Sequence, residues 1–180
     1  FAWQYCPYII KKGDMNHLSQ IRNKLIGSYK IVALTKEWKK DGETIVFTNG
    51  CFDLLHLGHI EYLARAASLG SKLIIGLNSD QSVKTLGKGG LRPIKDQKTR
   101  ATILAALEFV SAVVIFNEDT PYQLISSILP NILVKGGDWE IDAIAGADVV
   151  TKNGGQVKSI PFVEGYSTTN YVEIIQNGKS

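Results

Sequence analysis

Short and almost wholly apolar runs alternate along the chain with longer segments in which apolar residues recur at helical spacing. The short runs are rich in β-branched residues, which predicts strands buried on both faces. These strands are expected at 44–48, 72–77, 112–116, 132–134 and 156–160. Helices are expected at 59–67 with Gly70 as its C-cap, at about 98–107, after Pro121, and at about 168–175.

Strands of this kind, separated by helices, form a parallel sheet that helices cover on both faces. With right-handed crossovers the chain is expected to adopt a Rossmann-like, doubly wound α/β fold with a five-stranded parallel sheet. Residues 17–38 predict a helix, a connector and a second short helix packed on the outside. We therefore expect an N-terminal helical segment at 15–43 and the main domain at 44–180. Residues 1–14 lack the features of a signal peptide and are expected to be an extension outside the core.

Composition narrows the possible classes of protein. A chain of 180 residues with 44% hydrophobic content suits one globular domain. The net charge of +3 gives no case for nucleic-acid binding, and no apolar run approaches the roughly 20 residues that span a bilayer. Two cysteines, Cys6 and Cys51, are too few for a disulfide scaffold and favour a reducing cytoplasm.

Basic residues gather in one stretch of the chain. They are Lys84, Lys88, Arg92, Lys95, Lys98 and Arg100, opposed only by Asp96. The stretch is either a solvated basic loop or a polyphosphate site, because a concentrated positive field attracts such a ligand.

Polar or glycine-rich clusters follow four of the predicted strands. They occupy 49–59, 78–80, 135–139 and 164–170. In an open parallel sheet, ligands bind beyond the carboxyl ends of the strands. The four clusters are therefore expected to meet at one crevice.

The most informative cluster contains His56 and His59, separated by Leu57 and Gly58. Residues three apart share one face of a helical turn, so both imidazoles can point at one ligand. Gly58 allows close approach of a phosphate, and a helix start offers free N–H groups. Two alternatives stay open at this point: a metal site completed by Cys51 or Asp53, and simple packing at the helix start.

Other phosphate-binding motifs do not fit. Gly87-Lys88 has no upstream glycine of a Walker loop and is followed by glycine instead of Ser or Thr. No G-x-G-x-x-G pattern follows the first strand, which argues against a dinucleotide dehydrogenase.

The segment 47–59, FTNGCFDLLHLGH, resembles the signature of the HxGH cytidylyltransferase-like superfamily of nucleotidyltransferases. Four later segments resemble the D-glycero-β-D-manno-heptose 1-phosphate adenylyltransferases, which make ADP-heptose for the lipopolysaccharide inner core. These segments are 78–80 (NSD), 88–93 (KGGLRP), 133–138 (LVKGGD) and 164–170 (EGYSTTN). The first motif specifies only the superfamily, and the 135–138 and 167–170 segments point to the heptose enzymes. The family often occurs fused behind a sugar kinase domain.

The resemblance implies transfer of AMP from ATP to the sugar 1-phosphate and the release of pyrophosphate. As catalytic residues it implies His56, His59 and Lys88. As nucleotide-binding residues it implies Thr48, Asn49, Gly50, Phe52, Gly58, Gly137, Asp138, Ser167 and Thr168. As substrate-binding residues it implies Asp53, Asn78, Lys84, Arg92 and Arg100.

Several of these residue types also have ordinary structural roles. Ser167 and Thr168 stand at a helix start, where such residues commonly act as N-caps. Asp53 could equally cap its own loop, and Trp139 could pack instead of stacking on a ligand. The stretch 84–88 carries one residue more than the family pattern, which leaves open whether Lys84 or Lys88 reaches the phosphates.

The resemblance further implies Mg²⁺ held mainly by the ATP phosphates, without a carboxylate cage or other metal site in the protein. It implies a cytoplasmic homo-oligomer, a dimer, with no nucleic-acid or membrane partner. The main alternative is a cytidylyltransferase that acts on glycerol 3-phosphate or another alcohol phosphate. A non-catalytic nucleotide-binding regulator and a class I tRNA-charging enzyme are weaker alternatives, the latter because the chain has no Lys-Met-Ser-Lys-Ser loop.

Overall fold

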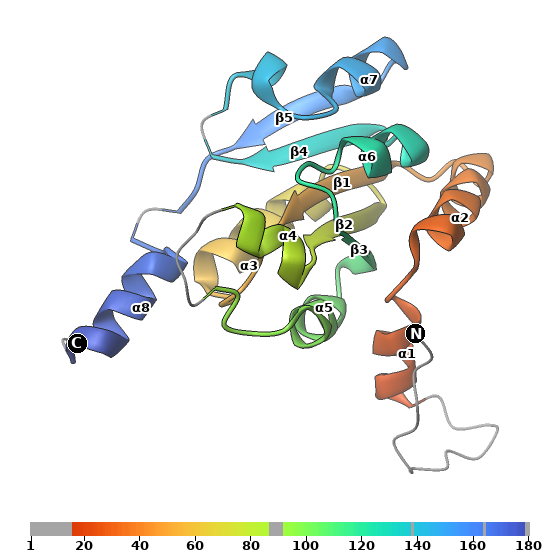
Figure 1. Ribbon diagram of the computed structural model, residues 1–180. Helices are drawn as coiled ribbons and strands as arrows, with labels where there is room; N and C mark the ends of the chain where they lie inside the picture. Colours follow the sequence, from red (N-terminus) through yellow and green to blue (C-terminus); the bar gives the residue numbers. More distant parts are fainter. Residues whose placement is uncertain (1–15, 87–91, 138, 164, 179–180) are drawn as a thin grey trace.

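Five parallel strands form the single sheet of the computed structural model, which describes residues 16–86, 92–137, 139–163 and 165–178 (Figure 1). The strands are β1 (Ile45–Gly50), β2 (Lys72–Asn78), β3 (Val110–Phe116), β4 (Ile132–Gly136) and β5 (Gln156–Ile160). Their spatial order is β3-β2-β1-β4-β5, with every neighbouring pair parallel. The predicted Rossmann-like α/β fold with a five-stranded parallel sheet is confirmed.

Helices alternate with the strands along the chain. They are α1 (His17–Asn23), α2 (Ser28–Lys40), α3 (Leu57–Ala67), α4 (Asp80–Thr85), α5 (Gln97–Ala105), α6 (Tyr122–Ile128), η1 (Ile141–Ala143), α7 (Ala147–Lys152) and α8 (Thr168–Asn177). The second N-terminal helix, expected to be short, has 13 residues and is the longest among the described residues. Across this part of the chain, no helix combines the length and apolar character needed to cross a membrane.

The apolar core lies on both faces of the sheet, as the wholly apolar strands predict. One cluster packs α3 and α5 against the sheet through residues such as Leu63 and Leu104. The opposite cluster includes Ile31 of α2 and Ile125 of α6, together with residues of α7. The N-terminal segment thus contributes to the core, and a parallel bridge between Leu25 and Val113 ties it to the β3 edge of the sheet.

The strand order reverses direction between β1 and β4. β1 pairs with β2 on one side and with β4 on the other, and the chain leaves both β1 and β4 at the same edge. In open α/β sheets, this switch point beyond the carboxyl ends of the strands is where ligands bind. A ligand is therefore expected to bind at the segments that follow Gly50 and Gly136.

Gly70 does not act as the expected C-cap. The helix ends at Ala67 with Ser68 as its C-cap in the right-handed region, and Gly70 is absent from the glycines with positive φ. A Cβ at Gly70 would instead lie 2.6 Å from the carbonyl oxygen of Thr44 and 2.7 Å from Val46 Cγ2. The glycine is required because the chain passes close to the start of β1.

Gly70→Ala is expected to lower the free energy of unfolding by about 1–3 kcal/mol, because the added methyl overpacks against backbone that cannot easily move. Gly27→Ala is the matched control, since a Cβ at Gly27 meets nothing within 4 Å. Urea unfolding of both variants checks the prediction. Equal, small effects would show that the Thr44 contact is not what fixes glycine at residue 70.

Candidate active site

The loop after β1 leads directly into the N-terminus of α3. His56 is the N-cap of this helix in extended conformation, and its side chain makes no capping hydrogen bond. The first-turn amides of an 11-residue helix are thus left without a side-chain partner from the cap. Such a helix start favours an anionic ligand, because its N–H groups and the helix dipole both carry positive partial charge.

The two histidines lie together at this helix start. Their imidazole rings stack with centroids 3.8 Å apart and an interplanar angle of 28°. The Nδ1 atoms of both rings are buried and have no hydrogen-bond partner among the described residues. Buried polar nitrogens normally have partners. Their presence here is consistent with an external ligand that supplies them.

Burial keeps both histidines neutral near pH 7. Desolvation lowers the pKa of His59 from 6.5 to about 4, the nearby His56 lowers it further, and a hydrogen bond with the backbone of Leu54 acts in the opposite direction. Desolvation also lowers the pKa of His56. The site therefore presents two neutral imidazoles, each of which has one ring nitrogen, Nδ1, without a partner among the described residues.

The residues before the histidines are tightly constrained. Phe52 is a non-glycine residue with φ of 44°, a left-handed conformation that is unfavourable for a bulky side chain. Its ring meets His59 edge-on, with centroids 5.3 Å apart. A Cβ at Gly50 would lie 2.9 Å from the Phe52 ring, so the glycine leaves room for it. The strained loop thus places an aromatic ring against His59.

Gly58 lies where the C-terminal segment approaches α3. A Cβ there would come within 3.1 Å of Tyr166 Cβ and 3.2 Å of His56 Nδ1. Tyr171 of α8 stacks on His56 with ring centroids 5.8 Å apart. Figure 1 shows α8 beside the edge of the sheet where β4 and β5 end. The start of α8 is therefore brought to the start of α3.

Ser167 is the N-cap of α8, and its hydroxyl accepts a 3.0 Å hydrogen bond from the Asn170 amide. The capping role considered for Ser167 is thus present. A hydroxyl that accepts this bond still has its own proton to donate, so capping and phosphate binding are compatible. Thr168 is the first residue of the helix.

The end of β4 lies at the same edge of the sheet as the end of β1. Gly137 has φ of 101°, which favours glycine, and its amide donates to the Ile160 carbonyl at 2.9 Å. The Trp139 indole donates to the Gly136 carbonyl at 3.0 Å. Lys135 Nζ lies 3.4 Å from Asn49 Oδ1 and 5.7 Å from the centroid of the Trp139 ring, which brings the ends of β1 and β4 together.

Two residues expected at the ligand have buried side chains directed elsewhere. The hydroxyl of Thr48 is fully buried and lies 2.5 Å from the Tyr62 hydroxyl. The Asn78 amide donates to Ser82 at the start of α4. Contact with a nucleotide through Thr48 would therefore involve its backbone, and Asn78 fixes the chain that leaves β2.

Asp53 and Arg100, expected at the substrate, are also buried. The Asp53 carboxylate accepts 2.9 Å hydrogen bonds from the amides of Ile94 and Lys95. The Arg100 guanidinium donates to the carbonyls of Lys95 and Cys51 and to the Asp80 carboxylate. These polar groups already have protein partners, so the structure favours a supporting role for both.

The basic residues expected at the ligand differ in their exposure to solvent. Lys84 is exposed in the last turn of α4, and Arg92 is half-buried in the segment before α5. Lys88 and Asp138 lie outside the described residues. Within the described ranges, no three His, Cys, Asp or Glu side chains gather to hold a metal ion. The Asp53 carboxylate faces Ile94 and Lys95, which gives no support to a metal site completed by this residue.

Two residues of the site were not among the expected contacts. Lys135 stands in the strand-end cluster, and its position beside Asn49 follows from the pairing of β1 with β4. Tyr171 lies in α8, about one helical turn after Ser167, and its ring stacks on His56. A sequence does not reveal these contacts, because each joins segments far apart in the chain.

Comparison with known proteins agrees with this geometry. Residues 47–174 match the model of the cytidylyltransferase-like family. The chain is 48% identical over 161 residues to the bifunctional protein HldE of Wolinella succinogenes, covering 89% of this chain and 33% of that protein. It is 54% identical over 137 residues to the bifunctional protein HldE of Geobacter metallireducens, covering 76% and 28%. The chain thus spans roughly a third of the length of these relatives.

Solved structures resemble the chain as well. The lipopolysaccharide core biosynthesis protein of Thermoplasma volcanium GSS1 is 28% identical, with a TM-score of 0.57 over 70% of this chain and 100% of that one. Pantoate–β-alanine ligase of Francisella tularensis, at 14% identity and a TM-score of 0.52 over 85% and 76%, shares the fold. The family-model match over residues 47–174, which includes the HxGH pair at the start of α3, shows that the chain belongs to the cytidylyltransferase-like family.

Proposed function

We propose that the chain transfers AMP from ATP to D-glycero-β-D-manno-heptose 1-phosphate, giving ADP-heptose and pyrophosphate for lipopolysaccharide core synthesis. The observation that carries the transfer reaction is the stacked pair of His56 and His59 at an uncapped helix start, facing the start of α8. The choice of adenine and heptose rests on the resemblance of the 135–138 and 167–170 segments to the heptose enzymes. Relatives at about half identity named HldE support the same assignment.

The reaction needs no general base, because the acceptor phosphate oxygen is already anionic. This oxygen forms a bond to the α-phosphorus of ATP while the bond from that phosphorus to the bridging oxygen breaks, and pyrophosphate leaves. Catalysis then consists of alignment and neutralisation of charge. His56 and His59 bind the α- and β-phosphates, and Ser167 and Thr168 hold the β- and γ-phosphates.

Basic residues complete the site. Lys88, with Lys84 and Arg92, neutralises charge on the triphosphate or the sugar phosphate. We assign binding of the base or ribose to the Gly136–Gly137 backbone and to Asp138. Mg²⁺ would be held mainly by phosphate oxygens and would shield their charge, which suits a cation that keeps few protein ligands. We place the enzyme in the cytoplasm, where ATP is available, and the homodimer remains a prediction.

One observation favours a second candidate. The matching family model is that of cytidylyltransferase-like domains, and such enzymes can use CTP and an alcohol phosphate such as glycerol 3-phosphate. The two candidates share the histidine pair and differ in base and acceptor.

Pyrophosphate release from ATP, CTP, GTP and UTP, each with heptose 1-phosphate and with glycerol 3-phosphate, tests the proposal. ATP with heptose 1-phosphate is expected to turn over at least ~10²-fold faster than the other pairs, because a mismatched base leaves buried polar groups unpaired. Faster release from CTP with glycerol 3-phosphate would favour the second candidate. Absence of release from every pair would contradict both.

A further inference from the structure

Two loops at the site are joined by a closed set of hydrogen bonds. One loop is Cys51–Asp53, between β1 and the histidines, and the other is the pair Ile94–Lys95, just before α5. Asp53 Oδ1 accepts from the amides of both Ile94 and Lys95 at 2.9 Å, and Oδ2 also lies 2.9 Å from the Ile94 amide. Hydrogen bonds from backbone amides to a carboxylate are charge-assisted, which makes them stronger than bonds between neutral groups.

Arg100 connects the same two loops through its guanidinium group. Its Nε donates to the Lys95 carbonyl at 3.0 Å and its NH1 group to the Cys51 carbonyl at 2.6 Å. Its NH2 group makes a 2.7 Å ion pair with Asp80, which lies at the start of α4 after β2. The side chain is completely buried, and a buried guanidinium is stable only when its donors are paired in this way.

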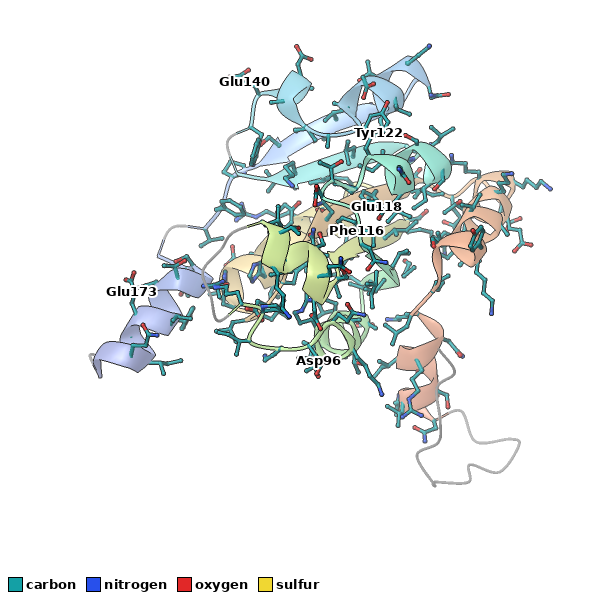
Figure 2. All side chains as sticks on the ribbon, in the orientation of Figure 1. Asp96, Phe116, Glu118, Tyr122, Glu140 and Glu173 are labelled. Atoms are coloured by element: carbon teal, nitrogen blue, oxygen red, sulfur yellow. The ribbon has the colours of Figure 1, made fainter. Side chains whose placement is uncertain are left out.

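The helix that carries Arg100 is itself anchored. Asp96, labelled at the start of α5 in Figure 2, is the N-cap and accepts from the Thr99 amide at 2.9 Å and the Thr99 hydroxyl at 2.8 Å. This cap, one residue after Lys95, fixes the first turn of α5. The guanidinium therefore projects from a rigid element toward both loops.

The Cys51–Asp53 loop contains Phe52, the residue with a strained backbone. Phe52 lies between Cys51, held by Arg100, and Asp53, held by the amides. Its φ of 44° persists only if surrounding contacts impose it. Because the Phe52 ring meets His59 edge-on at 5.3 Å, the position of that histidine depends on the loop.

We infer that Asp53 and Arg100 are positioning residues. Together they form a clamp that fastens the Cys51–Asp53 loop to residues 94–95 and so holds Phe52 against His59. This inference rests on the proposed function only for its effect on catalysis. Neither side chain contacts a substrate in this account, which differs from the substrate-binding role expected for both. The half-buried Arg92 lies two residues before Ile94, so the same clamp also holds the chain next to this basic residue.

Amide hydrogen exchange of Ile94 and Lys95, measured by NMR, tests the clamp without reference to activity. In Asp53→Ala the exchange of both amides is expected to accelerate on the order of 10-fold or more, because their acceptor is removed. Asp53→Asn should give an intermediate effect, since one acceptor oxygen is replaced by a donor facing the Ile94 amide. Arg65→Lys, which alters an exposed pair with Glu61, is the control and should leave both amides unchanged.

Steady-state kinetics and the same exchange measurement, applied to Arg100→Lys as well as to the Asp53 variants, test the consequence. Arg100→Lys cannot reach all three acceptors, so kcat should fall on the order of 10-fold while the KM for either substrate changes no more than about twofold. A raised KM for the acceptor with unchanged kcat and unchanged exchange would put Arg100 on the substrate and overturn the inference. Accelerated exchange in a protein whose wild type turns over no substrate would support the clamp and contradict the proposed function. Unchanged exchange in Asp53→Ala would refute the clamp whatever the activity.

Discussion

Turnover is expected to fall on the order of 10²-fold or more when His59 is replaced by alanine, and by a similar factor when His56 is replaced. The stacked imidazoles stand at the start of α3. In the proposed mechanism they bind the phosphates on which charge develops during transfer. Loss of a preorganised donor weakens binding of the transition state more than binding of the substrate, so kcat falls more than KM rises. Initial rates at saturating ATP and acceptor check the prediction.

The third histidine provides the matched control. His17 is exposed in α1, and His17→Ala should retain full activity. Circular dichroism should show that each variant keeps its helical and strand content. Near-normal turnover of either site variant would remove the phosphoryl-transfer role of the pair. Stoichiometric zinc in the purified protein, lost in the same variants, would instead support the metal alternative.

Stability of the unliganded protein is expected to decline as the pH is lowered from 7 to 5, by about 1–2 kcal/mol from His59 alone after allowance for solvent screening. The pKa of His59 is about 4 in the folded protein and 6.5 as its ordinary value. Between these values the unfolded chain binds a proton that the folded chain excludes, so acid favours unfolding. The contribution is fully present above pH 6.5 and is lost as the pH falls toward 4.

Urea unfolding of wild type and His59→Gln at several pH values isolates this effect, because titrating carboxylates are common to both proteins. The free energy of unfolding of wild type should drop more steeply between pH 7 and 5 than that of the variant. His56, whose pKa is also lowered by burial, should leave a smaller slope of the same sign. Parallel curves for the two proteins would mean that His59 titrates normally and is not held neutral.

The sheet was predictable because its strands are apolar on both faces, a pattern that few other environments produce. Helices α4 and α7 were not anticipated, because each has only six residues, too few to show a helical period of apolar residues. Gly70 was misinterpreted because its sequence position after a helix suits a C-cap, whereas the Thr44 carbonyl that demands a glycine lies far upstream.

At the site, too, features set by local spacing were predictable, whereas contacts between distant segments were not. The spacing of His56 and His59 predicts their shared face, and the structure brings the rings to 3.8 Å. Arg100 belongs by sequence to a basic cluster, and only the fold shows that its guanidinium is buried against Asp80 while Lys84 is exposed. The stacking of Tyr171 on His56 depends on where α8 returns to the sheet, which local sequence does not encode.

The identity of the product formed in competition tests the central claim most directly. The protein is given equal ATP and CTP with D-glycero-β-D-manno-heptose 1-phosphate and Mg²⁺, and the products are identified by mass spectrometry. ADP-heptose is expected as the major species, accompanied by an equal amount of pyrophosphate. A CDP-linked sugar as the major species, or faster transfer to added glycerol 3-phosphate than to the heptose, would contradict the proposal and favour the cytidylyltransferase.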